Sequence, residues 1–281
     1  PCRDWRAWWE AGDRVRYLQF LAKDNVPFHA ISFPATLLGS GLPLKLADTI
    51  KGFNWLTFES GKFSTSAQRG IFADKALAAL PADTWRWWLA ANAPEGADSD
   101  FTTERFVAGI NKDLADTFGN LVHRCLSFVA GRYGNVVPWG GAAGPTEAVL
   151  ACRLTECLRR LRHHHETLEF RKAAEQVRAV WRLGNAYLAA QAPWAAFERE
   201  PERAAIVART GVNLVRAAAL AAWPFIPTAA ERVLENVGEA SDVVSWPNDG
   251  EAALAAIPGG RRIAVPPPLF RKITVADVPH P

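Results

Sequence analysis

In the first 60 residues, apolar runs are separated by polar residues in the order typical of a strand followed by a helix. A mostly apolar run, Tyr17 to Ala22, leads into the polar Lys23-Asp24-Asn25 and then into an amphipathic stretch from about 26 to 38. This order predicts a strand, a turn and a helix. A second apolar run, from Phe53 to Phe58, predicts another strand. Two strands cannot bury both faces of a sheet, so we expect a segment upstream of this chain to complete it.

Beyond residue 60 the periodicity becomes helical. Helices are predicted at Asp74 to Leu80 and at Ala82 to Ala93, and apolar residues from Phe106 to Cys125 mark one buried face of a long helix. Further helices are expected at about 146–165, 167–191, 200–222 and 227–236. Short connections between such helices favour a bundle. The last segment, from Ser245, is rich in proline and glycine and predicts an irregular tail that packs back on the body.

These patterns predict an α/β remnant followed by an all-α helical bundle. We divide the chain into residues 1–60 for the α/β part, 61–100 for a connecting region, 101–244 for the helical domain and 245–281 for the tail.

Composition narrows the class of protein only a little. The 281 residues are 49% hydrophobic and 22% charged, which is typical of a soluble globular protein. The formal net charge is only +3, so any contact with nucleic acid must come from a local patch. Four cysteines without CxxC spacing indicate neither a zinc knuckle nor a disulfide framework, and fit a reducing cytoplasm. No uninterrupted apolar run reaches the length of a membrane span, so we expect no membrane partner.

The loop from Gly61 to Ser66, with the sequence GKFSTS, lies between the second predicted strand and the next helix. The Lys62 charge and the hydroxyl groups of Ser64 and Ser66 suit the phosphates of ATP, because they follow the charge that develops there during adenylation. The same residue types also make ordinary solvated turns, which is the alternative for an isolated loop of this kind.

Two further features concern RNA. Asp116, Asn120 and Arg124 are spaced i, i+4, i+8, which puts them in one line on the long predicted helix. Such a line can read base edges in an RNA loop, although a solvated helix face is the usual meaning of a polar stripe. Trp194 follows Pro193 near the end of another predicted helix, a position typical of an exposed surface on which an unpaired base stacks.

Together these motifs resemble the methionyl-tRNA synthetase family of class I aminoacyl-tRNA synthetases almost from end to end, with the KFSTS form of the second signature loop. The resemblance implies a carboxyl-terminal half. Residues 1–60 would be the end of a Rossmann-type catalytic domain, 61–100 the signature loop and stem-contact region, and 101–244 the anticodon-binding domain. The implied activity is that of a methionine-tRNA ligase, in which ATP and methionine give methionyl-adenylate and the acyl group then passes to tRNA(Met).

The resemblance also assigns roles near the nucleotide. Lys62, Ser64 and Ser66 would form the catalytic loop, and Asp24 would bind the ribose of ATP. Asn25 and His29 would line the methionine pocket. The structural alternative is that Asp24 caps a helix and His29 is a core histidine with a satisfied nitrogen.

Two positions depart from the family pattern. Thr65 stands where the commoner pattern has a second lysine, so Arg69 is expected to reach the phosphates together with Lys62. Ala22 stands where the family usually has glycine, and its methyl group would crowd the nucleotide.

At the other end of the chain, Asn120, Arg124 and Trp194 match the family residues that recognise a CAU anticodon. Asp116 is a fourth candidate, although some family members carry asparagine there.

ATP and Mg²⁺ are the implied cofactors, with Zn²⁺ possible only through an upstream insertion. We expect no metal site in this chain, because His163, His164, His165 and Glu166 are consecutive helical residues that point in different directions. The expected partners are tRNA(Met), methionine, ATP and the upstream catalytic half, without which this chain should be inactive. Two alternatives stay open: a synthetase-like paralogue that adenylates an amino acid for a small-molecule pathway, and a non-catalytic tRNA-binding module.

Overall fold

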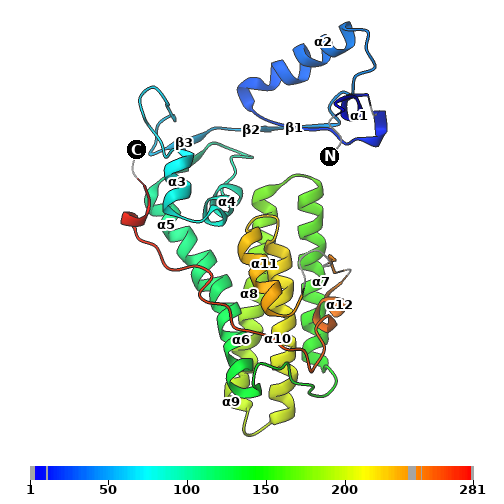
Figure 1. Cartoon of the computed structure of the whole chain (residues 1–281), viewed down its shortest axis with the longest axis vertical. Coiled ribbons are helices and arrows are strands. Elements are labelled where there is room, and N and C mark those ends of the chain that lie inside the picture. The colour runs from blue at the N-terminus through cyan, green and yellow to red at the C-terminus, as the bar shows by residue number, and fades with distance from the viewer. Residues whose placement is uncertain (1–3, 11, 240–244, 248, 280–281) are drawn as a thin grey trace. The chain divides into compact units, whose positions relative to one another are not determined.

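The computed structural model describes residues 4–10, 12–239, 245–247 and 249–279. The chain divides into two compact units, whose elements are labelled in Figure 1. The first contains the described residues up to Phe63 together with Ala93–Phe101, and the second contains Ser64–Asn92 and the described residues from Thr102 onward. Each unit is described by itself.

The first unit contains two small parallel sheets. Strand β1 (Leu18–Ala22) pairs with β2 (Thr49–Phe53), and β3 (Leu56–Phe58) pairs with β4 (Ser99–Phe101). The strand predicted from Tyr17 to Ala22 is therefore confirmed.

The single strand predicted from Phe53 to Phe58 is wrong, because Asn54 and Trp55 interrupt it. Both turn their backbone amides to another segment: Asn54 donates to the carbonyl of Pro94 at 2.8 Å, and Trp55 donates to the Asp98 carboxylate at 2.8 Å. These bonds move the chain from the β1 pairing to the β4 pairing.

A short helical connection follows β1. It begins with the 3₁₀ turn η2 (Lys23–Asn25), continues through a π-helical turn η3 (Phe28–Ser32) and ends with α2 (Phe33–Gly39). The predicted order of strand, turn and helix is confirmed. Before β1 lie a short helix α1 (Arg6–Trp9) and a 3₁₀ turn η1 (Gly12–Arg14).

The second unit begins with α3 (Ala73–Ala79) and α4 (Ala82–Ala91), as predicted. The long helix predicted beyond residue 102 consists of α5 (Thr103–Ile110), a π-helical segment η4 (Asn111–Gly119) and α6 (Asn120–Tyr133).

The π-helical segment corrects the expectation of one regular helix, and its cause is visible in the sequence. Phe106, Ile110, Leu114 and Phe118 are spaced four residues apart, and all are buried. In a regular α-helix of 3.6 residues per turn, each such step would carry the next side chain about 40° further round the axis. Wider turns keep this row on the core face.

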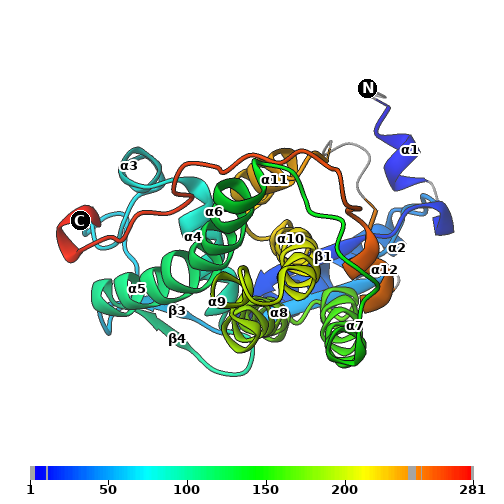
Figure 2. The same ribbon diagram turned by 90° about the horizontal axis from the view of Figure 1, so that it is seen from below.

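Four more helices complete the bundle, together with a short one. They are α7 (Pro145–Glu166), α8 (Phe170–Gln191), the short α9 (Pro193–Ala196), α10 (Pro201–Ala222) and α11 (Pro227–Asn236). All the long helices agree with the predicted ranges. Figures 1 and 2 show α10 surrounded by its neighbours, and it contacts α6, α7, α8 and α11.

Helix α10 contains no uninterrupted apolar run of the length of a membrane span, as expected, because Arg209, Asn213 and Arg216 lie within it. It is long and apolar enough to cross a membrane by length and composition, with a mean hydropathy of 1.3 over its most apolar window. However, 89% of that window is buried inside the fold, as in the core helix of a soluble protein.

The core of the second unit is built around Trp181 on α8. Its ring stacks on Phe118 at 5.0 Å and lies 4.7 Å from Trp87, and its Nε1–H donates to the carbonyl of Ala218. Two glycines allow the helices to approach closely: a Cβ at Gly184 or at Gly211 would lie 2.9 Å from Leu121 or Cys125, respectively.

The tail beyond Ser245 is less irregular than predicted. It contains α12 (Gly250–Ala255), whose first turn is capped by Asp249 through a 2.8 Å bond from the amide of Ala252, and a 3₁₀ turn η5 (Val275–Asp277). Asn213 on α10 pairs with the backbone of Ile257 in both directions, and Asn111 does the same with Ile273. These paired bonds fasten the tail along the bundle (Figure 1).

Candidate functional site

In the first unit, the candidate residues Asp24 and Asn25 lie in η2, directly after the carboxyl end of β1. Ligands of parallel α/β sheets gather at such strand ends. Both side chains are exposed, and the helical turns that follow have no side-chain cap. The alternative role of Asp24 as a helix cap is therefore wrong, and its carboxylate faces solvent.

His29 is held against the sheet. Its Nδ1 lies 3.2 Å from Oε1 of Gln19, a buried residue of β1, and Gln19 in turn donates to the Tyr17 hydroxyl at 2.6 Å. One imidazole nitrogen is thus satisfied, as the structural alternative predicts. The ring stays half-buried beside the strand end, so its orientation is fixed there.

The first part of the signature loop is a tight turn. Glu59 and Ser60 have positive φ angles of 47° and 62°, and Gly61 exchanges backbone hydrogen bonds with Phe58. Asp100 on β4 anchors the turn by accepting from the Ser60 amide at 3.0 Å. Lys62 follows directly and is exposed, so its ammonium group is accessible to solvent next to a rigid turn.

The second part of the loop, in the second unit, closes on itself. Ser64 and Arg69 exchange backbone hydrogen bonds of 2.9 and 2.8 Å. Inside the closed turn, the Ser64 hydroxyl lies 3.3 Å from that of Ser66 and accepts from the Ala67 amide. The structure therefore brings the two predicted serines together, with the exposed Arg69 at the base of the turn.

In the bundle, Arg124 and Trp194 meet although 70 positions separate them in the sequence. The guanidinium carbon of Arg124, on α6, lies 4.6 Å from the centroid of the Trp194 ring, on α9. Ala192 turns the chain out of α8 in a left-handed conformation, Pro193 is buried, and Trp194 remains 40% exposed. A cation over an indole face at this distance is a favourable cation–π contact.

Asn120 lies one helical turn before Arg124, at the start of α6. Its side-chain amide donates to Oδ1 of Asn185 on α8 at 3.4 Å, and Asn185 itself donates to the carbonyl of Thr117 at 2.9 Å. Asp116 differs from these residues. It belongs to the π-helical segment, and its carboxylate pairs with Lys272 of the tail at 2.9 Å.

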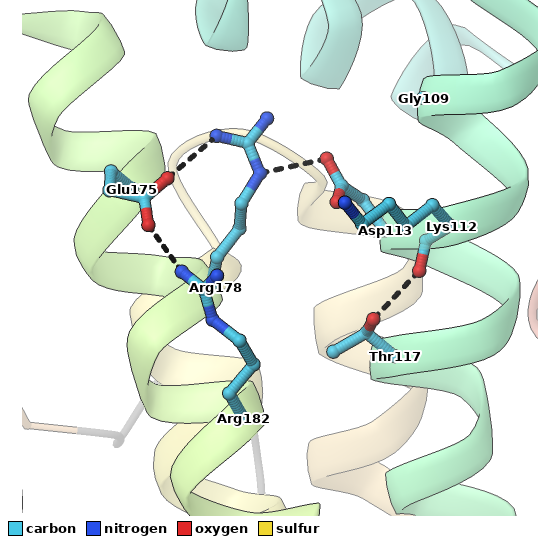
Figure 3. A pocket seen from close by; sticks show the side chains of 7 residues that line it. All are labelled: Gly109, Lys112, Asp113, Thr117, Glu175, Arg178 and Arg182. Atoms are coloured by element: carbon cyan, nitrogen blue, oxygen red, sulfur yellow. Dashed lines mark hydrogen bonds and ion pairs between the residues drawn. The ribbon is translucent and has the colours of Figure 1, made fainter.

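A polar groove adjoins these residues between η4 and α8 (Figure 3). It has a volume of about 300 Å³ and is lined by Gly109, Lys112, Asp113, Thr117, Glu175, Arg178 and Arg182. Sequence reasoning missed the residues of α8. Glu175, Arg178, Arg182 and Asn185 stand at i, i+3, i+7 and i+10, a polar row on the predicted helix from 167 to 191 that would have identified this face.

The histidine run also departs from expectation. His163 and His164 do approach each other, with ring centroids 5.4 Å apart, and Glu169 rather than Glu166 is the nearby carboxylate. Ligand atoms of His163, His164 and Glu169 lie within 4.8 Å of one another, so the argument that neighbouring helical histidines cannot converge is too strict. The Lys172 ammonium and His164 hold the pKa of Glu169 at about 2, and these hydrogen bonds already occupy its carboxylate.

Small parallel sheets with a helical connection, followed by a helical bundle, fit a class I aminoacyl-tRNA synthetase. Residues 2–126 match the family model described as tRNA synthetases class I (M). Residues 137–280 match the model of the anticodon binding domain of methionyl tRNA ligase. The chain belongs to the methionyl-tRNA synthetase family, and the expected fold class is confirmed.

Named relatives agree with this assignment. The chain is 51% identical over 276 residues to a methionine-tRNA ligase of Dinoroseobacter shibae, covering 97% of this chain and 48% of that protein. It is 48% identical over 281 residues to one from Streptomyces avermitilis, covering 98% and 49%. The chain thus spans about half the length of the curated relatives it matches.

Solved structures give the same picture. The structure of Mycobacterium tuberculosis methionyl-tRNA synthetase in complex with methionyl-adenylate has a TM-score of 0.79 and 29% identity, over 90% of this chain and 49% of that one. Its apo form has a TM-score of 0.78 and 29% identity, over 92% and 50%. The comparisons do not favour the amino-acid-activating paralogue or the non-catalytic module.

Proposed function

We propose that the protein is a methionine-tRNA ligase of the cytoplasm, and that this chain supplies its signature loop and its anticodon-reading surface. The observation that carries the proposal is the stacking of Arg124 on the exposed Trp194, with Asn120 on the adjacent turn. The names of the relatives support the reaction, and the bundle supports the RNA-binding role.

The three side chains suit the recognition of unpaired bases. Trp194 offers a ring for stacking, and stacking tolerates any base. Arg124 packs one face of its guanidinium on that ring, which leaves the N–H groups at its edge to donate to a base. The Asn120 amide both donates and accepts, so it can pair with a Watson–Crick edge. We assign the CAU anticodon of tRNA(Met) to this surface. The pairing of Asp116 with Lys272 makes Asp116 the weakest candidate.

The residues of the first unit fit ATP and methionine. The Asp24 carboxylate is exposed at a strand end, where it can accept hydrogen bonds from ribose hydroxyl groups. Ala22 has a φ of −82°, which any residue adopts, so its backbone does not need glycine. His29 and Asn25 would line the methionine side of the same strand end. Solved structures of the Mycobacterium tuberculosis relative hold methionyl-adenylate, which supports this assignment.

The loop residues fit phosphate. Lys62 and Arg69 are exposed cations, and the paired hydroxyl groups of Ser64 and Ser66 are donors from a closed turn. Mg²⁺, when bound to ATP, would neutralise phosphate charge, and Zn²⁺ would belong to a part of the protein outside this chain. In the whole protein, Lys62→Ala and Arg69→Ala should both slow methionine-dependent pyrophosphate exchange. Unchanged rates in both variants would contradict this role for the loop.

Binding of this chain to an RNA hairpin tests the anticodon assignment. One hairpin carries CAU and a second differs by one anticodon base, both at a fixed and stated salt concentration. We expect a preference for CAU that Trp194→Ala abolishes. Release of one stacked base should cost about 1–3 kcal/mol, and the preference should be lost because Arg124 no longer has the ring that orients it toward a base. Trp139→Ala is the matched control, since Trp139 is also an exposed tryptophan of the second unit. Equal and weak binding of both hairpins by the unaltered chain would overturn the proposal.

A further inference from the structure

The groove between η4 and α8 has no role in the proposed recognition of bases, yet it concentrates charge. Two carboxylates, Asp113 and Glu175, line it together with three cations, Lys112, Arg178 and Arg182. Figure 3 shows that the cations come from both walls, Lys112 from η4 and the two arginines from α8. The groove therefore has a positive balance in a chain whose overall charge is small.

The two arginines play different parts. Arg178 is mostly buried: its Nε donates to Asp113 at 2.8 Å, and its guanidinium lies 5.2 Å from the Trp87 ring centroid. Asp113 is also buried and accepts from the Trp87 indole at 3.1 Å. This network joins α4, η4 and α8, so Arg178 holds the groove in shape. Its remaining contact is with Glu175 at 3.3 Å.

Arg182 is the more exposed of the two arginines. Its side chain is 58% exposed, and it pairs with Glu175, which is itself half exposed and shared with Arg178. Exposed ion pairs of this kind contribute little free energy. A phosphate accepts two parallel hydrogen bonds from a guanidinium fork, so it can displace Glu175 from Arg182. The exposed Lys112 faces the same space from the opposite wall.

The groove continues into the proposed base-reading surface. Arg182 and Asn185 are three residues apart on α8 and therefore lie on the same face. Asn185 accepts from Asn120 and donates to the carbonyl of Thr117, a residue that lines the groove. A nucleic-acid strand whose bases reach Asn120 would thus run directly beside Arg182.

More positive charge lies on the other side of the α8 ridge. Arg182 also lines a second groove between α7 and α8, together with Arg153 and Arg160. Glu156 is the carboxylate of that groove and pairs with Arg160 at 2.5 Å. Arg182 therefore lies between two sets of cations, as a residue that binds a polyanion would.

We propose that Lys112 and Arg182 form a backbone-phosphate site for the RNA strand whose unpaired bases meet Asn120, Arg124 and Trp194. The inference rests on the proposed function and adds to it a contact that does not depend on sequence. In the free protein Glu175 occupies Arg182, and in the complex a phosphate takes its place. Phosphate contacts fix the register of the strand, while the base contacts select its sequence.

The test measures the dissociation constants of this chain for the CAU hairpin and the changed hairpin over a series of salt concentrations. Arg182→Gln should weaken binding of both hairpins equally, by roughly 3- to 10-fold at low salt, and lower the salt slope by about 0.7–0.9 for the lost phosphate. The preference for CAU should stay unchanged. Glu175→Gln, which removes the competing carboxylate, should strengthen binding of both hairpins.

Arg159→Gln is the matched control. Arg159 is an exposed arginine of α7 that pairs with Glu156 much as Arg182 pairs with Glu175, but it lines neither groove. Its replacement should leave affinity and salt slope unchanged. Thermal unfolding of each variant separates loss of fold from loss of contact, and Arg178→Gln, which breaks the buried network, should lower the melting temperature.

The outcomes separate the two proposals. An unchanged salt slope in Arg182→Gln, or a slope change equal to that of Arg159→Gln, would overturn the phosphate site. If the unaltered chain shows no preference for CAU while Arg182→Gln still lowers the slope, the phosphate site stands and the anticodon assignment fails.

Discussion

The two units of this chain differ in how far their large apolar side chains are buried. In the first unit, Phe28, Ile31 and Leu38, on the helical turns after β1, are 63%, 68% and 69% exposed. In the second, Trp181, Leu126 and the greater part of α10 are fully buried. The difference teaches that the bundle carries its own core, whereas the α/β unit has an apolar face with no cover among the described residues.

The architecture explains the difference. A helix on a parallel sheet needs a further layer to bury both faces, and two strands with one helical connection cannot supply it. The relatives are about twice as long as this chain. We propose that another part of the protein covers the exposed face. Each large apolar side chain left in water forgoes about 1.5–3 kcal/mol, so the first unit alone should be marginally stable.

Hydrogen exchange gives the largest expected contrast. In this chain alone, amides of α6 and α10 should open with free energies at least about 4 kcal/mol above those of β1 and β2, roughly a 1,000-fold difference in protection. The strands should open more easily because the apolar face of their unit is exposed to water. Native-state exchange followed by mass spectrometry measures both units in one sample. Equal protection in the two units would refute the contrast.

A matched pair of leucines tests the same contrast by mutation. Leu126→Ala, in the core of the second unit, should cost about 2–5 kcal/mol, because it leaves a cavity among closely packed helices. Leu38→Ala, on the exposed face of α2, should change stability by no more than about 0.5 kcal/mol. Urea unfolding of the two variants provides the comparison. A large loss in Leu38→Ala would mean that the face is covered within this chain.

The sequence predicted the second unit better than the first, for a physical reason. Long helices with a regular apolar face leave a strong periodic signal, so α7, α8, α10 and α11 were found close to their true ends. The short strand β4 has the sequence Ser-Asp-Phe and was missed. Three residues carry no alternation, and this strand exists only because β3 lies beside it.

The sequence also identified some candidate site residues and missed others. The sequence singled out Arg124 and Trp194, and the fold brings them together, although no spacing rule links α6 to α9. The ion-paired row of α8 that includes Arg182 was missed because charged helix faces are usually only solvated. The π-helical segment was not foreseen either, and Asp116, which lies in it, pairs with Lys272 of the tail.

Two carboxylates, one in each unit, allow the units to be compared by the pH dependence of stability. Burial raises the pKa of Glu147, but hydrogen bonds from Arg203, Tyr187 and the Gly144 amide outweigh burial and lower it from 4.5 to about 2. A carboxyl group whose pKa is lower in the folded state than in the unfolded state stabilises the fold. This contribution is fully present above about pH 4.5 and is lost as the pH falls toward 2. The loss should reach at most about 3 kcal/mol.

Urea unfolding between pH 5 and 3 would measure this dependence, and Glu147→Gln should flatten it. Asp98 in the first unit is the control. The hydrogen bond from Lys23 lowers its pKa as well, but the pair is exposed to solvent and salt. Asp98→Asn should therefore leave the acid sensitivity of the bundle unchanged. Acid sensitivity that persists in Glu147→Gln would assign it to other carboxylates.

Two helical glycines give modest expected effects that differ in sign. A Cβ at Gly184, on α8, would lie 2.9 Å from a methyl carbon of Leu121, so Gly184→Ala should destabilise the bundle by about 1–3 kcal/mol through overpacking. At Gly39, the last residue of α2, a Cβ would meet nothing within 4 Å, and φ is not positive. Gly39→Ala should therefore stabilise by about 0.4–1 kcal/mol, because the unfolded chain loses freedom. Opposite shifts in thermal unfolding would show that only the second unit is closely packed, and a loss of stability in Gly39→Ala would show that the open face of α2 is already in contact.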